Sequence, residues 1–196
     1  MVAIPPGPDC RAFWIGRVPV TNREYGAFLA AGGAAAPPWF DEPGFRDPLR
    51  PVVGVTWEEA ASYCAWIASA AGGAWRLPDE AEWLHAISGG RPAAPTPWGE
   101  RVPPGEVPEG PLSGPWETGG GTPNAFGVFD PGTMVHEWCA NWREPGDGAS
   151  PGALPRRASR GGSWRHAIRW SAPSAKSSLP PAFRYSDYGF RALREG

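Results

Sequence analysis

The chain has 196 residues, enough for one domain with a sizeable core, and a net charge of −2 at neutral pH. Its 27 glycines and 26 prolines would favour disorder, but 12 tryptophans, eight phenylalanines and four tyrosines can fill a core. No run approaches the roughly 18 apolar residues of a membrane span, so a membrane-spanning protein is not expected.

Charge is unevenly placed along the chain. Residues 156–196 hold nine of the 18 basic residues and two of the 20 acidic ones. Such a segment could face a nucleic acid or pack against the acidic remainder of the chain. Because no basic block exceeds two residues, we favour packing, and a nucleic-acid partner is not expected.

The cysteines and the N-terminus indicate a cytoplasmic protein. The three thiols, Cys10, Cys64 and Cys139, cannot all pair, and none has C-x-x-C spacing. The first residues lack the charged and then apolar run of a secretory leader.

Residues 2–4 and 13–18 read as short extended segments. Three helices are then predicted by one capping signature, a Thr or Asp followed three residues later by Glu. The pairs are Thr21 with Glu24, Thr56 with Glu59 and Asp79 with Glu82, and glycine pairs at 32–33, 72–73 and 89–90 end the helices. Cys64 falls on the apolar face of the second helix, which places it in the core.

The second half of the chain has less periodicity. Residues 90–122 and 145–155 predict irregular loops, whereas 159–164, 182–185 and 189–193 alternate like short strands. A few helices and several short strands give the α+β class, and the absence of a linker gives a single domain over 1–196.

The stretch 123–142, PNAFGVFDPGTMVHEWCANW, is read as an irregular loop bracketed by Asp130 and Glu137. Calcium prefers oxygen ligands from carboxylates and backbone carbonyls, which such a loop can supply. More commonly, acids in such loops cap turns by accepting hydrogen bonds from backbone amides. Calcium ligation and turn capping therefore both stay open as interpretations.

Eight segments in order resemble the formylglycine-generating enzyme (sulfatase-modifying factor) family. They are PVTNREYGAFL (19–29), PVVGVTWEEAASYCAW (51–66), WRLPDEAEWLHA (75–86), PWG (97–99), NAFGVFD (124–130), HEWCANW (136–142), RGGSW (160–164) and YGFRAL (188–193). The resemblance implies a C-type-lectin-like fold with small sheets, flanking helices and much irregular structure. Members of that family range from copper-dependent cysteine oxidases to iron-dependent enzymes that form C–S bonds and to non-catalytic binding proteins.

The resemblance implies a structural calcium site at Asp130, Thr133, Val135 and Glu137. One departure is that Thr133 and Met134 replace the Gly-Asn pair of the family's turn. We also expect Arg160 of the RGG motif and Arg191 of the GFR motif to form buried ion pairs that hold the sheet.

The copper enzymes of the family carry two cysteines after the GGS motif, which as thiolates hold Cu(I). Here that run, residues 161–176, contains no cysteine. We therefore expect neither copper nor formylglycine formation.

Iron is a weaker alternative. A site of two histidines and a carboxylate could use His136 and His166, with Glu137 near in sequence. We do not expect the separate helical domain that supplies most iron ligands in the C–S bond-forming members, and lone histidines more often line a wall through hydrogen bonds.

The primary interpretation is a binding or accessory module for a peptide or small anionic ligand, with a metal-dependent oxidoreductase as the alternative. The expected cleft is lined by residues of two turns. They are His136, Trp138, Ser163, Trp164, Arg165, His166, Arg169 and Trp170.

Overall fold

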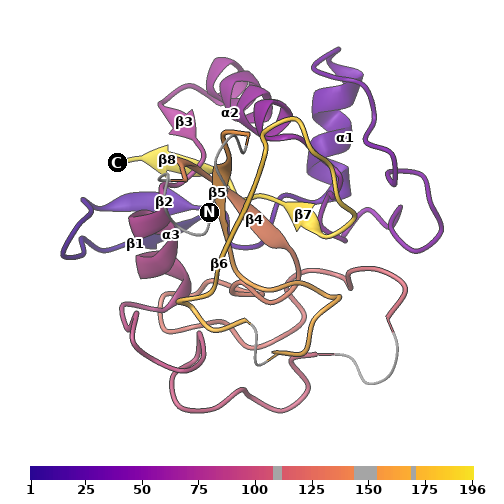
Figure 1. The fold of residues 1–196 in the computed structure, drawn as a ribbon. Helices are drawn as coiled ribbons and strands as arrows, with labels where there is room; N and C mark the ends of the chain where they lie inside the picture. The colour runs from indigo at the N-terminus through magenta and orange to yellow at the C-terminus, as the bar shows by residue number, and fades with distance from the viewer. Residues whose placement is uncertain (108–111, 144–153, 169–170) are drawn as a thin grey trace.

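The computed structural model describes residues 1–107, 112–143, 154–168 and 171–196 (Figure 1). Three helices, α1 (Asn22–Ala30), α2 (Trp57–Ala71) and α3 (Glu80–Ile87), follow the predicted caps. In each, the cap side chain accepts from the N3 amide while the N3 glutamate accepts from the cap amide, so all three capping boxes are confirmed.

The first sheet joins the two ends of the described chain. It contains β1 (Val2–Ile4), β2 (Phe13–Ile15), β8 (Leu193–Glu195) and β3 (Trp75–Arg76), in that order and all antiparallel. Because β8 lies between β2 and β3, residues 193–195 pair with segments from the first half of the sequence, and both termini lie near this sheet (Figure 1).

The second sheet has the order β6 (Lys176–Leu179), β5 (Arg157–Arg160), β4 (His136–Trp142) and β7 (Tyr188–Gly189). Its first three strands are antiparallel, whereas β4 and β7 are parallel, with His136 opposite Tyr188. This one parallel pairing decides where the candidate site lies.

Two sequence predictions need correction. The irregular stretch ends at Val135, and 136–142 form strand β4, because these residues pair on both sides, with β5 and β7. The strand predicted at 182–185 is absent, and 176–179 pair with β5 instead. Phe183 and Tyr185 are exposed, so the alternation there did not mark a buried face.

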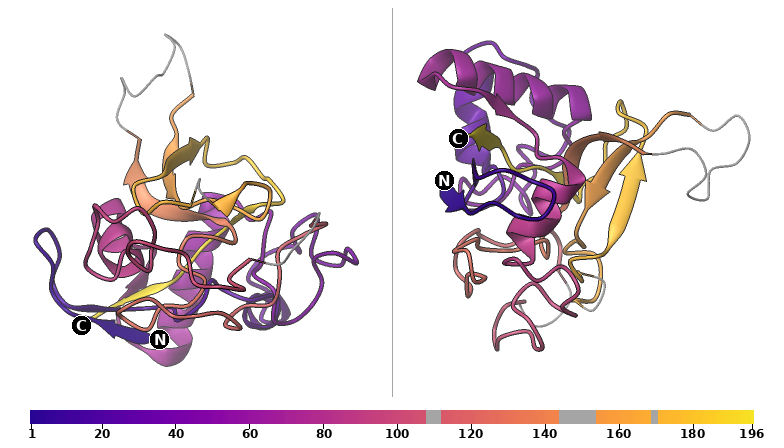
Figure 2. Two further views of the ribbon diagram at one scale, coloured as in Figure 1. Left: turned by 90° about the horizontal axis from the view of Figure 1, so that it is seen from below. Right: turned by 90° about the vertical axis from the view of Figure 1, so that its left-hand side faces the viewer.

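The core lies on both faces of β4. Trp138 packs in a cluster with Tyr25, Tyr63 and the α2 face, while the next residue, Cys139, packs with Trp83 of α3 and the first sheet. Figure 2 shows α1 and α2 on one side of the molecule and the second sheet on the other. In the described parts of 90–122 no helix or strand forms, as expected.

None of the helices in the described ranges has the length and apolar character needed to cross a lipid bilayer.

Candidate functional site

The first two members of a polar cluster are brought together by the parallel pairing of β4 and β7. His136 opens β4, and Asp187 comes directly before β7. The His136 amide donates to the Asp187 carbonyl at 2.8 Å. Two side chains from distant parts of the sequence therefore lie side by side at the same end of the sheet.

The third member comes from the turn after β5. Gly162 donates to the Gly132 carbonyl at 2.9 Å, and Trp164 donates to the Met134 carbonyl at 2.9 Å. Gly161 has φ +82°, and a Cβ there would lie 3.0 Å from the Gly132 backbone, so this position needs glycine. The turn is thus fixed against the start of β4, and it presents His166 to His136.

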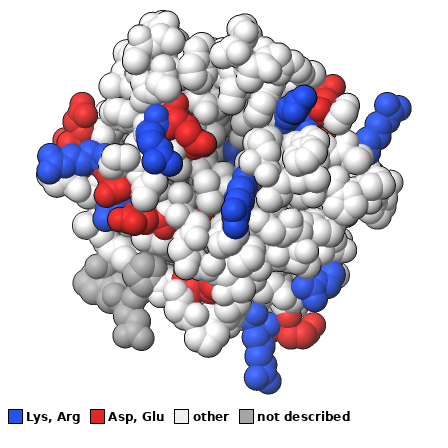
Figure 3. Space-filling model, turned by 180° about the vertical axis from the view of Figure 1, so that it is seen from behind, with Lys and Arg blue, Asp and Glu red and all other residues white. Residues whose placement is uncertain are grey.

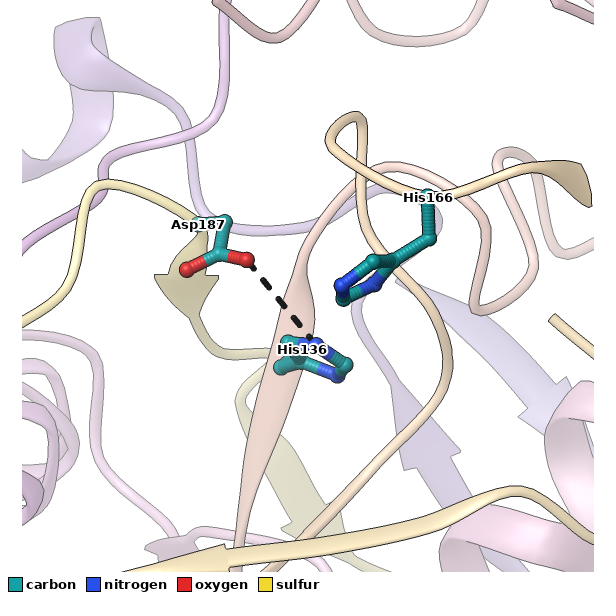
Figure 4. Close-up of side chains that lie close together, drawn as sticks. All are labelled: His136, His166 and Asp187. Carbon is teal, nitrogen blue, oxygen red and sulfur yellow. Dashed lines mark ion pairs between the residues drawn. The ribbon is translucent and has the colours of Figure 1, made fainter. Parts of the chain in front are cut away.

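His136, His166 and Asp187 converge on one point (Figure 4). Each offers a donor atom, and these atoms all lie within 4.8 Å of one another. His136 Nε2 lies 3.9 Å from Asp187 Oδ2, and the two imidazole centroids are 5.4 Å apart. In the described part of the chain this is the one group of three or more such side chains.

Hydrogen bonds fix which nitrogen of each imidazole carries the proton. His136 Nδ1 lies 2.7 Å from the Gly161 carbonyl, which can only accept, so Nδ1 is protonated and Nε2 has the lone pair. Ser163 Oγ donates to Asp187 Oδ2 at 2.9 Å, so it accepts from His166 Nδ1 at 3.2 Å. In the neutral form of each imidazole, Nε2 is therefore the nitrogen that carries the lone pair.

The electrostatics of the cluster are those of a cation site. Asp187 is 6% exposed, and no lysine or arginine of the described chain pairs with it. Burial lowers the pKa of His136 below 6.5, although the neighbouring Asp187 carboxylate opposes this shift, so its imidazole is neutral at pH 7. A buried carboxylate without a counter-charge is costly, and a bound cation would remove that cost.

The predicted cleft residues are partly brought together. Ser163 is buried beside Asp187, Trp164 is half-buried, and Arg165 is exposed with its guanidinium 5.6 Å from the Trp164 ring. The prediction that Trp138 lines the cleft needs correction. Its side chain is fully buried in the core, where Nε1 donates to the Val55 carbonyl. The predicted residues Arg169 and Trp170 lie outside the described residues.

Asp187 was missed as a candidate ligand. Glu137, the carboxylate near His136 in sequence, points to the opposite face of β4. No spacing in the sequence connects residue 187 with residue 136, because their proximity arises from strand pairing. The one available signal was its position directly before the YGFRAL segment.

The expected calcium ligands are occupied by protein groups. Arg191 Nε lies 3.0 Å from both Glu137 carboxylate oxygens, and Trp83 Nε1 donates to one of them at 2.7 Å. Arg191 also donates to the Asp130 carbonyl at 2.8 Å. The guanidinium therefore places a positive charge where a cation would have to sit. The expected ion pair of Arg191 is confirmed, and so is that of Arg160 with Glu80 at 2.8 Å.

The remaining donors do not complete a calcium site. The Asp130 side chain accepts from the Gly119 amide at 2.7 Å, and burial raises the pKa of its carboxyl group. Thr133 and Val135 are buried, at 3% and 0% exposure. The arrangement does not fit calcium, and the calcium prediction itself awaits a binding measurement.

The thiols do not form a soft metal site. Cys139 is fully buried, and this burial raises the pKa of its thiol well above the ordinary value. Burial raises the pKa of the Cys64 thiol to about 12. Cys10 lies near His85, at the edge of the first sheet's core. None of the three cysteines belongs to the His136 cluster.

The basic segment packs against the acidic body, as predicted. Three of its arginines bind earlier acids, Arg160 with Glu80, Arg184 with Glu59 and Arg191 with Glu137. On the face shown in Figure 3, basic and acidic side chains are interspersed over a mostly uncharged surface.

A sequence model of the family described as Sulfatase-modifying factor enzyme 1-like domain matches residues 7–196. The chain is 29% identical to serine/threonine-protein kinase pkn1 of Chlamydia pneumoniae over 226 residues, which is 93% of this chain and 33% of that protein. It is also 29% identical to the formylglycine-generating enzyme of Streptomyces coelicolor over 177 residues, 76% of this chain and 54% of that one. It thus spans about a third and about half of these relatives.

Among solved structures, PvdO from Pseudomonas aeruginosa superposes with a TM-score of 0.78 and 27% identity, over 95% of this chain and 82% of that one. The expected α+β, C-type-lectin-like architecture is confirmed.

Proposed function

Since this chain belongs to the family of sulfatase-modifying factor enzyme 1-like domains, we propose that it is a metal-dependent oxidoreductase of that family without a thiolate copper centre. The proposed ligands are His136, His166 and Asp187. Two imidazoles and one carboxylate with open positions are the ligand set of non-haem Fe(II) oxygenases. A redox-active divalent ion held there would supply the electron-transfer or oxygen chemistry of such an enzyme.

One observation carries the proposal: the Nε2 atoms of two imidazoles and a carboxylate with no Lys or Arg partner in the described residues converge on one point. Metal–nitrogen bonds of about 2.0–2.1 Å put ligands on one face of an ion about 3–3.4 Å apart, so the 3.9 Å between His136 and Asp187 has to shorten slightly on binding. The wider separations close by a small rotation, which exposed His166 is free to make.

The protein's own part is to orient the ligands. The Gly161 carbonyl and the Ser163 hydroxyl hold the two imidazoles in the tautomer that leaves Nε2 free. Such outer partners commonly set the direction and basicity of metal-bound histidines. Ser163 also holds Asp187, so one buried hydroxyl orders two of the three ligands.

The metal site is tested by metal content and affinity. Protein purified without chelators or affinity tags should contain about one transition-metal ion per chain, and should bind added Fe(II) or Zn(II) with the same stoichiometry. H166Q and D187N each remove a proposed ligand. Their metal affinity should therefore fall by at least the roughly 10–100-fold that is typical when a hydrogen-bonding partner of a ligand is removed. H85Q is the matched control, because His85 contacts the Pro5 carbonyl away from the cluster.

Oxygen uptake distinguishes the two candidate functions. An oxidoreductase loaded with Fe(II) should consume oxygen in the presence of a reductant, and H166Q should not.

The second candidate is a metal-independent binding module for a peptide or small anionic ligand. It is favoured by Arg165, which is exposed beside Trp164 and makes no ion pair with a described acid. A protein that binds no metal but retains anionic peptides through Arg165 would support that second function.

A further inference from the structure

A concave site lies at the other end of β4 from the metal cluster. It is a cavity of about 290 Å³ between α2, β3 and the ends of β4 and β5. This volume is at the small end for ligand pockets, which suits a compact molecule. None of the proposed metal ligands contributes to it. Its lining residues are Trp57, Ala61, Cys64, Ala65, Trp75, Arg76, Leu77, Ala140 and Arg157.

The walls of this cavity are apolar because the polar ends of its tryptophans are already bonded. Trp57 Nε1 donates to the Cys139 carbonyl at 2.9 Å, and Trp75 Nε1 donates to the Gly72 carbonyl at 2.9 Å. Helical spacing puts Trp57, Ala61 and Cys64 on one face of α2. The rings and small side chains thus form a slot for a flat apolar group.

The two arginines of the cavity differ in charge balance. Arg76 is neutralised by Glu82 at 2.7 Å and by Glu195 at 2.9 Å. Arg157 forms no ion pair with any acid in the described ranges, and its buried Nε has no acceptor there. Of the two cations that line the cavity, Arg157 is thus the one without an acidic partner in the described ranges.

The Arg157 guanidinium is also held in a fixed position. Its Cζ lies 3.5 Å from the Trp57 ring centroid and 3.7 Å from that of Trp142, and Nη1 donates to the Ala140 carbonyl at 2.7 Å. Burial lowers the pKa of this guanidinium, which reflects the cost of its desolvation. A carboxylate would offset that cost through charge-assisted hydrogen bonds.

We propose that this cavity binds a small carboxylic acid with a flat apolar body, its carboxylate on Arg157 and its apolar part between α2 and Trp75. The site is independent of the metal cluster. The binding of either ligand can thus fail without affecting the other.

The probe is 3-phenylpropionate, with 3-phenylpropanamide as its uncharged analogue and acetate as the charged group alone. Calorimetry on the whole chain should show saturable binding of one 3-phenylpropionate per chain. The amide should bind at least roughly 10-fold more weakly, because a hydrogen bond to a charged group is lost. Acetate should bind more weakly still.

Three variants test the geometry. R157Q should weaken 3-phenylpropionate binding by roughly 10-fold or more and leave the amide almost unchanged. A61L should abolish binding of both compounds by filling the slot, and it leaves Arg157 in place should R157Q fail to fold. A70L, at an exposed position of α2 outside the cavity, is the matched control and should bind like the wild type.

Equal affinity for the acid and the amide would overturn the assigned role of Arg157, as would full affinity in folded R157Q. Unchanged binding in A61L would place the probe elsewhere on the protein. An absence of saturable binding at millimolar concentrations would reject the site itself.

Discussion

The Glu137–Arg191 pair can be tested sharply, because Glu137 is either a calcium ligand, as the resemblance implies, or the buried partner of Arg191. In the structure, Glu137 and Arg191 are 1% and 0% exposed and form an ion pair at 3.0 Å. We consider E137Q, which keeps the shape of the side chain but removes its charge. Arg191 is then left buried without a counter-ion, and Trp83 Nε1 loses its charged acceptor.

The expected cost follows from these contacts. Breaking a buried ion pair by removing one partner typically costs about 3–5 kcal/mol. Arg191 retains three backbone carbonyl acceptors, at 2.8–3.2 Å, so the lower end, about 3 kcal/mol, is expected. For a chain of this size that corresponds to a fall in Tm of roughly 6–12 °C.

Calorimetric or urea unfolding measures this loss, with E195Q as the control. Glu195 also pairs with an arginine, but its side chain is 55% exposed, so the control should lose about 1 kcal/mol or less. Added calcium should leave the Tm of the wild type unchanged, because Arg191 occupies the expected calcium position. Equal losses in the two variants would refute the buried pair, and a chelator-induced fall in Tm that calcium reverses and E137Q abolishes would restore the calcium site.

The remaining predictions concern the metal ligands, acid stability and the thiols. S163A should fold normally but bind metal roughly 10–100-fold more weakly, as isothermal titration would show, and unchanged affinity would remove Ser163 from the site. Burial acts to raise the pKa of Glu82, but hydrogen bonds from Arg76 and the Asp79 amide lower it overall. As the pH falls, Glu82 therefore takes up its proton in the unfolded chain before it does so in the folded one, and the free energy of unfolding should decrease below about pH 4.5. In urea titrations at graded pH, E82Q should lose the part of this pH dependence that Glu82 causes. Iodoacetamide should leave Cys139 unmodified until the protein unfolds, as peptide mass spectrometry would show, and rapid labelling of the folded protein would contradict its burial.

The sequence alone determined the elements whose signals are local. A capping box needs residues only three apart, so α1, α2 and α3 could be placed from their Thr or Asp and Glu pairs. The family resemblance gave the architecture, and the missing cysteines after GGS argued against thiolate copper. Alternation without a partner misled at 182–185, because a strand is defined by the segment that it pairs with.

Tertiary structure decided everything that depends on pairing between distant segments. It put Glu137 on the core face, where Arg191 binds it, and it brought Asp187 to His136 through the parallel pairing of β4 and β7. From the sequence the two acids cannot be told apart, but Glu137 pairs with Arg191, whereas Asp187 pairs with no Lys or Arg among the described residues. Only the fold fixes which carboxylate pairs with an arginine, since that depends on the distance to groups far along the chain.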